Sequence, residues 1–528
     1  MFSQLITSRR FWPMFWCQFV SALNDNFIKN ALAILILYQI ATTSGGALVA
    51  LAGAVLVIPF FFLSALGGEL ADKYDKARIA QYLKLAEIPV AVLAAIGFLM
   101  AGSGQPALVD ASIYVLFAVL FLFGCGAALF GPIKFGMLPD HLETKELPAA
   151  NAMVEGATFL AILAGTIAGG IAMTTSEGAA LVPAWAVGVA IIGFAAIGWW
   201  SAKMMMPTGR GQPDLIITTN PLTSTFRQLG ELKATRRLWI GGLIVSWFWL
   251  NGIVVTTLLP ALIKENLGGT ESVVTLSLAV FTIGIAVGSF LAARASRRRP
   301  NLALVPIGAL LMGVVALDIA GLLWRMDGVV ENSVDAVSIF ASWTGIRLMS
   351  DLALLAAAGG LFIVPAFAAV QSWAEADHRA RTIAAVNILN AAFMSVASLG
   401  VFAAQLNGVS LAVLFGVLGV ANLVAMLLVM RAWGREGLQD LGMFIFKQFL
   451  GLKVKGLENL PPAGTKAVIA PNHVSLLDAP ILFSAMPSHS AFAILHVIDE
   501  RPHSQWPCRI NRCPLDELEK RFDPPLLA

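Results

Sequence analysis

Long apolar runs, separated by short polar connections, follow one another from residue 13 to residue 431. Each run has on the order of 20 residues, the length that a helix needs to cross the hydrocarbon core of a bilayer. The pattern therefore predicts an all-α membrane protein with twelve spanning helices. Their approximate bounds are 13–40, 47–67, 81–101, 112–131, 150–174, 181–202, 238–262, 273–294, 302–324, 350–371, 382–404 and 409–431.

The predicted helices fall into two halves with similar patterns. A basic segment rich in proline and glycine, about 203–237, separates the sixth run from the seventh. The junction FGP (130–132) with Asn151 in the first half is echoed by IVP (363–365) with Asn387 in the second. Two parallel six-helix repeats are the plan of a major facilitator, although a tandem duplication without a transport role would look the same. We expect an N-terminal six-helix half (1–205), a cytoplasmic linker (206–237) and a C-terminal six-helix half (238–435).

Composition and charge agree with a multi-pass membrane protein. Hydrophobic residues make up 58% of the chain and charged residues 13%, whereas soluble proteins have about 25% charged residues. Basic residues gather in alternate connections, so the positive-inside rule predicts that both termini lie in the cytoplasm, with a bacterial inner membrane as the location. No cleavage site for a signal peptide follows the first run. The spacing of Cys508 and Cys513 is a weak signal for a metal site or a disulfide, and we interpret all four cysteines as ordinary thiols. We expect no cofactor, metal or nucleic-acid partner.

A polar cluster interrupts the first apolar run. An ionisable group inside a bilayer is costly and usually faces a partner or a watery cavity. Asp25 and Lys29 are four residues apart, on one helix face. They could simply neutralise each other at a helix interface, or they could form a polar site for a substrate that carries both a cation and an anion. The candidate substrate-binding residues of this run are Asn24, Asp25, Asn26, Lys29 and Asn30.

The connection after the second run, GELADKYDKAR (68–78), resembles the signature loop of the major facilitator superfamily, G-x-L-A-D-[RK]-x-G-[RK]-[RK]. In that family the aspartate, here Asp72, caps a neighbouring helix and pairs with a base to latch one state of the transporter. The resemblance implies a conformational latch, and Asp75 stands where the family has glycine. A basic loop that only sets topology is the alternative. The residues expected to form the latch are Gly68, Asp72, Lys73 and Arg78.

Further candidate residues lie at the ends of other runs. Lys134 follows the fourth run, where it could contact a phosphate headgroup or only extend to the membrane interface. Asn151 and Glu155 share one helix face in the fifth run, and Asn387 is the expected counterpart in the eleventh. FGCGAA (123–128) resembles the end of the fourth-helix motif of proton-coupled facilitators, and Leu120 stands where that motif carries an arginine, which argues against simple proton antiport.

ALNDNF (22–27) with NAL (30–32), GPIK (131–134) and the stretch from Asn151 to Glu155 together resemble the bacterial lysophospholipid transporters, over about residues 10–435. The resemblance implies a flippase that brings lysophosphatidylethanolamine-like lipids toward the cytoplasmic leaflet, with membrane lipids and a separate acyltransferase or acyl-carrier system as partners. A zwitterionic headgroup suits an acid and a base on one helix face. A facilitator that exports drugs or other amphiphiles is the alternative with the same fold.

The composition changes in residues 436–528. PNHVSLLDAP (471–480) follows a short apolar strand and resembles the first block of the glycerolipid acyltransferases. In that family the histidine, here His473, is the general base, and the aspartate, here Asp478, orients it. The family's later F-P-E-G-T-R block is absent, so we expect a short α/β fragment, truncated and inactive. A membrane-anchored 1-acylglycerophosphate-type acyltransferase is the alternative from another functional class.

Overall fold

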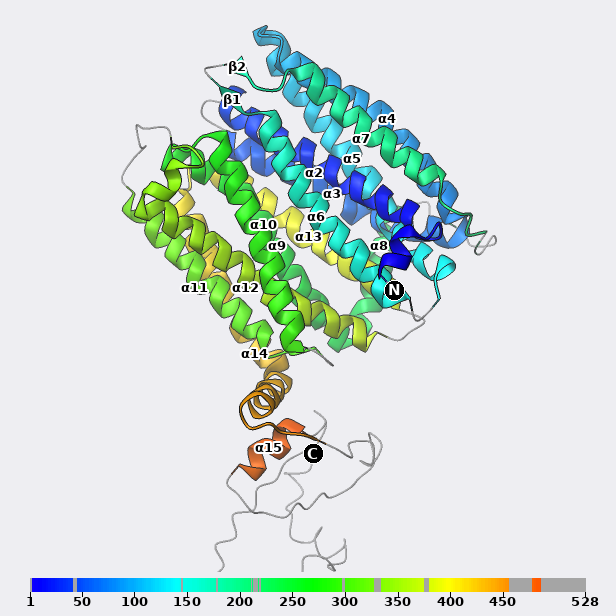
Figure 1. Cartoon of the computed structure of the whole chain (residues 1–528), viewed down its shortest axis with the longest axis vertical. Helices are drawn as coiled ribbons and strands as arrows, with labels where there is room; N and C mark the ends of the chain where they lie inside the picture. The colour runs from blue at the N-terminus through cyan, green and yellow to red at the C-terminus, as the bar shows by residue number, and fades with distance from the viewer. Residues whose placement is uncertain are drawn as a thin grey trace, which may run out of the picture. The chain divides into compact units, whose positions relative to one another are not determined.

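The computed structural model describes residues 2–40, 45–143, 146–176, 179–209, 211, 217, 220–296, 300–326, 334–374, 379–454 and 477–485. The chain divides into two compact units, Met1–Phe444 and Ile445–Ala528. The first unit is built almost entirely of helices (Figure 1). This agrees with the all-α membrane protein that the apolar runs predict.

The helices of the first half begin with α1 (Phe2–Thr7) and α2 (Trp12–Ile34), which continues as the π-helix η1 (Leu35–Ile40). They go on with α3 (Gly45–Lys73), α4 (Lys76–Ala101), α5 (Pro106–His141), α6 (Leu147–Ala172) and α7 (Ala184–Lys203). Strands β1 (Thr175–Ser176) and β2 (Ala179–Ala180) form a short antiparallel hairpin between α6 and α7.

The second half contains α9 (Arg236–Leu267), α10 (Glu271–Ser296), α11 (Leu304–Arg325), the 3₁₀ helix η2 (Ser338–Ala341), α12 (Trp343–Trp373), α13 (Arg379–Leu406) and α14 (Leu411–Phe449). Within the described ranges, eleven helices are long and apolar enough to cross a membrane. α6, the fifth predicted span, has 26 residues, and its apolar part is Leu160–Ala172. The predicted spans are therefore found as helices, most of them longer than expected.

The two halves repeat one packing scheme. α2 packs on α6, and α3 on α5, while α9 packs on α13, and α10 on α12. Glycines permit the closest approaches. A Cβ on Gly165 of α6 would lie 2.3 Å from the Leu23 carbonyl oxygen of α2, and one on Gly288 of α10 would lie 1.9 Å from that of Ala357 in α12. The expected six-helix repeats agree with this scheme, and the exact domain bounds stay predictions.

The predicted linker contains a helix that the sequence analysis missed. α8 (Pro221–Ala234) begins after Asn220, whose side-chain oxygen accepts a hydrogen bond from the Leu222 backbone N–H at 3.0 Å. An asparagine cap followed by proline at the first helical position is a favoured helix start. Ser224, Thr225 and Leu232 are buried, so one face of α8 packs on the first unit.

In the second unit the structure describes the end of α14, the residues up to Val454 and α15 (Asp478–Ala485). His473 lies outside the described residues. Asp478 is the first residue of α15, and the description does not include its side chain. The α/β fragment expected for 436–528 therefore stays a prediction.

Candidate functional site

The asparagines of the opening cluster hold helices together. Asn24 of α2 is buried, and its Nδ2 donates to the Ile191 carbonyl of α7 at 3.4 Å. Asn30 is buried too, and its Nδ2 donates to the Thr166 carbonyl of α6 at 2.7 Å. Asn26 bonds within its own helix, to the Ala22 carbonyl at 2.8 Å. Asn24 keeps one free acceptor, because its buried Oδ1 has no partner among the described residues.

Asp25 and Lys29 are both half-buried on α2. Their charges act on one another. None of the ion pairs found in the described part of the chain joins them directly, however. Direct neutralisation at a helix interface is therefore not what this conformation shows. Both side chains keep part of their surface open within a bundle of apolar helices.

A buried ion pair that the sequence analysis did not single out lies on α4. Lys84 Nζ is 2.5 Å from Glu87 Oε1, and Lys84 is only 1% exposed. The Lys84 ammonium also lies 4.4 Å from the centre of the Phe130 ring of α5, within the range of a cation–π contact. A buried charge needs such partners, because an unpaired one is strongly disfavoured in a low-dielectric interior.

The charges of this pair act on the opening cluster. The charges that act on Asp25 come from Glu87, Lys84, Lys134 and Lys29. Lys134, on α5, is half-buried. Helices α2, α4 and α5 thus bring two acids and three bases into one electrostatic environment inside the first half. Lys84 and Glu87 are paired with each other, whereas Asp25, Lys29 and Lys134 are half-buried.

Nothing in the described residues places three other candidates in this cluster. Asn151 and Glu155 lie on α6, and their side chains are outside the described residues. Asn387 is exposed on α13. Its neighbour Asn390 bonds across to Ser246 of α9 at 2.8 Å. The roles of Asn151, Glu155 and Asn387 stay predictions.

The second half carries an uncharged counterpart. Asn422 Nδ2 of α14 donates to Asn251 Oδ1 of α9 at 2.6 Å, and Trp247 Nε1 donates to Asn422 Oδ1 at 3.0 Å. This contact ties α9 to α14 as Asn24 ties α2 to α7. The polar position of the first helix is thus repeated in the second half.

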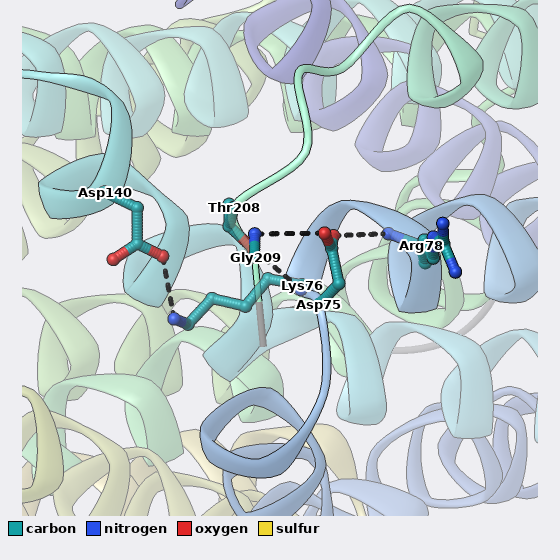
Figure 2. Close-up of polar contacts among 6 residues, drawn as sticks. All are labelled: Asp75, Lys76, Arg78, Asp140, Thr208 and Gly209. Carbon is teal, nitrogen blue, oxygen red and sulfur yellow. Dashed lines mark hydrogen bonds and ion pairs between the residues drawn. The ribbon is translucent and has the colours of Figure 1, made fainter. Parts of the chain in front are cut away.

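The signature loop has an unexpected cap. Asp75 Oδ1 accepts a hydrogen bond from the Arg78 backbone N–H at 3.1 Å, so Asp75 is the N-cap of α4 (Figure 2). Its Oδ2 accepts from the Gly209 N–H after α7, also at 3.1 Å. Asp72 is exposed and caps no helix here, because Asp75 occupies the position next to the helix start. Lys73 lies over the neighbouring Tyr74 ring.

Lys76 completes the connection between α4, α5 and the segment after α7. Its backbone N–H donates to Thr208 Oγ1 at 3.0 Å, and its Nζ lies 2.7 Å from Asp140 Oδ2 (Figure 2). The loop therefore connects three segments of the first half. A role of Gly68, Asp72, Lys73 and Arg78 as a latch between states stays a prediction.

Glu69, also in the signature loop, attaches the linker helix. It is buried, and its Oε1 accepts from Ser224 Oγ at 2.5 Å and from Arg227 Nη2 at 2.8 Å, both on α8. α8 also packs against α13 and α9 of the second half. The linker is thus fixed to both halves in this conformation.

Direct polar contacts between the two halves gather at the end where α2 and α9 finish. Tyr38 Oη donates to the Gly269 carbonyl at 2.7 Å, and Lys264 Nζ donates to the Leu37 carbonyl. Thr175 Oγ1 donates to Glu271 Oε1 at 3.1 Å. These connections are the ones with few basic residues, which the positive-inside rule assigns to the outer face.

The first unit thus contains two six-helix halves that pack against each other, and the charged cluster lies inside the first half. The profile of the Major Facilitator Superfamily matches residues 14–330. The chain belongs to the major facilitator superfamily. As a facilitator it is a membrane transporter, and its spanning helices fit a multi-pass membrane protein.

Relatives and solved structures agree with this family. The chain is 27% identical to the lysophospholipid transporter LplT of Pectobacterium carotovorum, over 70% of this chain and 80% of that protein. It is 26% identical to the LplT of Serratia proteamaculans, over 69% and 81%. An auto-inhibited POT family peptide transporter matches with a TM-score of 0.57 at 15% identity, covering 81% of this chain and 97% of that one. A D-xylose–proton symporter gives 0.56 at 14%, with coverage of 81% and 97%. At these identities the structures support the fold alone.

Proposed function

We propose that this facilitator transports lysophospholipids, such as lysophosphatidylethanolamine, from the outer to the cytoplasmic leaflet of a bacterial inner membrane. The observation that carries the proposal is the set of half-buried charges Asp25, Lys29 and Lys134 inside the first half. The similarity to proteins named lysophospholipid transporter LplT supports the same substrate class.

The charges match a zwitterionic headgroup. The carboxylate of Asp25 would accept hydrogen bonds from the headgroup amine, while Lys29 and Lys134 would donate to the phosphate. The Lys84–Glu87 ion pair would not contact the headgroup, because Lys84 has almost no exposed surface. The acyl chain would remain among apolar side chains or lipid, so only the headgroup would need polar partners.

Direction and topology follow from the charge pattern of the connections. Both termini would lie in the cytoplasm, because Lys73, Lys76 and Arg78 of the signature loop and the basic linker belong to the same set of connections. The halves would then be joined at the outer end by Tyr38 and Lys264. A lipid taken from the outer leaflet would leave toward the cytoplasmic side.

The segment 436–528 is the second part of the proposal. Its resemblance to the first block of the acyltransferases would place a lysolipid-modifying module on the cytoplasmic side, after α14. We propose that transport does not depend on it, so His473→Ala should leave uptake unchanged. Acyltransferase turnover that survives Asp25→Asn, in a protein without uptake, would favour the anchored-enzyme alternative.

The decisive experiment measures uptake of labelled lysophosphatidylethanolamine into cells or vesicles that carry the full chain. We expect Asp25→Asn to lower the uptake rate at least tenfold, because the amide cannot pair with the amine as a carboxylate does. Asp110→Asn, at an exposed position of α5, is the matched control and should leave the rate unchanged.

Two other outcomes are informative. No uptake of any lysolipid by well-inserted protein would reject the proposal and favour an exporter of other amphiphiles. Uptake that Asp25→Asn does not change would keep the function but exclude Asp25 from the headgroup site.

A further inference from the structure

Three charged side chains meet between α11 and α12, in the second half and apart from the site described above. Arg347 of α12 donates from Nε to Asp318 Oδ2 of α11 at 3.0 Å, and from Nη2 to Asp318 Oδ1. Asp351 lies four residues after Arg347, on the same helix face, and is 8% exposed. The charges of Asp318 and Asp351 act on one another across the packed helices α11 and α12.

The charges of this group do not balance if both acids are ionised. Arg347 supplies one positive charge, and its fork is directed at Asp318. Arg325 also acts on Asp318, whereas the charges that act on Asp351 are those of Asp318 and Arg347. The Oδ2 atom of Asp351 is buried and has no donor partner among the described residues. An ionised Asp351 would therefore be a buried carboxylate without its own counter-charge, which is strongly disfavoured within a membrane-spanning helix.

A proton resolves the imbalance. With Arg347 held by Asp318, two ionised carboxylates would repel one another, whereas a proton on one of them leaves the group neutral. The Oδ2 atom of Asp351 is too enclosed for an amine or a hydrated cation, but a proton needs no such space. We infer that Asp318 and Asp351 bind one proton between them, and that this proton joins α11 to α12 in a neutral group with Arg347.

The site is placed to exchange its proton with the adjacent solution. The side chains of Arg347 and Asp318 are 31% and 41% exposed, and Arg347 is the fifth residue of α12. Loss of the proton would leave two carboxylates against one guanidinium, which would repel one another across the helix contact. The α11–α12 contact should thus weaken as the pH rises on the side of these helix ends.

Infrared spectroscopy of the full chain in lipid vesicles tests the inference. The carbonyl stretch of a protonated carboxyl disappears when the pH is raised, and the change can be assigned by substitution. We expect Asp351→Asn to remove one such carboxyl signal. Asp318→Asn should remove the same signal, because Asp351 would then ionise and pair with Arg347. Loss of one shared signal in both variants is a result that a merely structural pair of acids would not give.

Asp335 provides the control. It is an exposed acid in the segment before α12, and hydrogen bonds from Ser338 and Val337 hold its pKa below the usual value. Its carboxylate is ionised at neutral pH, so Asp335→Asn should leave the protonated-carboxyl signal unchanged. The inference is wrong if Asp351→Asn leaves the signal intact, or if Asp318→Asn leaves a protonated Asp351 in place.

Discussion

At the scale of single residues, the interior of the first half contains both enclosed and half-buried charges. Lys84 and Glu87 are enclosed and held to each other, while Asp25, Lys29 and Lys134 retain exposed surface. A buried ion pair of this kind contributes little net stability, yet it is costly to break. Its value for the site is that it fixes the charges next to Asp25.

Removing one member of the buried pair should therefore destabilise the protein. Lys84→Met leaves Glu87 with an uncompensated charge, and we expect a loss of about 3–5 kcal/mol of folding free energy. The double variant Lys84→Met with Glu87→Gln removes both charges and should recover most of that loss. Thermal unfolding of the purified protein in detergent measures both. Equal destabilisation by the single and the double variant would contradict the ion-pair account.

Asp25 and Lys29 were identified in the sequence because they are charged residues inside an apolar run. Lys84 and Glu87 interrupt an apolar run in the same way. Their three-residue spacing within 81–101 was a usable signal. What the sequence could not provide was the partner of each charge. Asp25 and Lys29 have the favoured spacing for an ion pair but do not form one in this conformation, in which charges of α4 and α5 also act on Asp25.

At the scale of elements, the signature loop differs from the family pattern in which aspartate caps a helix. The family's glycine is Asp75 here, and Asp75 takes the cap of α4 and the Gly209 N–H. The exposed Asp72 keeps its family position without the expected cap. The linker helix α8 was not predicted either, because its helix-start signal at Asn220 and Pro221 lies in a basic segment that we interpreted only as a linker.

Loss of the Asp75 cap should have a measurable local effect. Asp75→Ala leaves the first turn of α4 without its acceptor and frees the Gly209 N–H, which should cost about 1 kcal/mol. We expect faster proteolysis of the segment after α7 and a lower melting temperature. Asp72→Ala is the matched control and should change neither, since Asp72 is exposed. A larger loss of stability for Asp72→Ala would restore the family's assignment of the cap.

At the scale of the whole first unit, the sequence predicted the helices and their twofold repeat well, because spanning length and alternating basic connections are strong local signals. The state of the transporter could not be predicted in this way. It depends on contacts such as Tyr38 with Gly269 and Thr175 with Glu271, which join residues about a hundred or more positions apart. These contacts hold the halves together at one end, beside an apolar pocket of about 320 Å³ between α6 and α10 that includes Thr174 and Ser272.

Weakening the polar contacts between the halves at this end should favour its open state. Tyr38→Phe removes one hydrogen bond between the halves, worth about 1 kcal/mol, which corresponds to a shift of about fivefold in the balance between closed and open states. The readout is labelling of Ser272→Cys by a membrane-impermeant maleimide, with the four native cysteines replaced by alanine. We expect labelling to become about fivefold faster with Tyr38→Phe and to stay unchanged with Tyr82→Phe, a tyrosine that is 70% exposed on α4.

Because the reagent acts from one side, faster labelling from outside the cell would also assign this end to the outer face. Labelling only from the cytoplasmic side would reverse the proposed topology, and no change in either direction would mean that Tyr38 packs at this end without holding it closed.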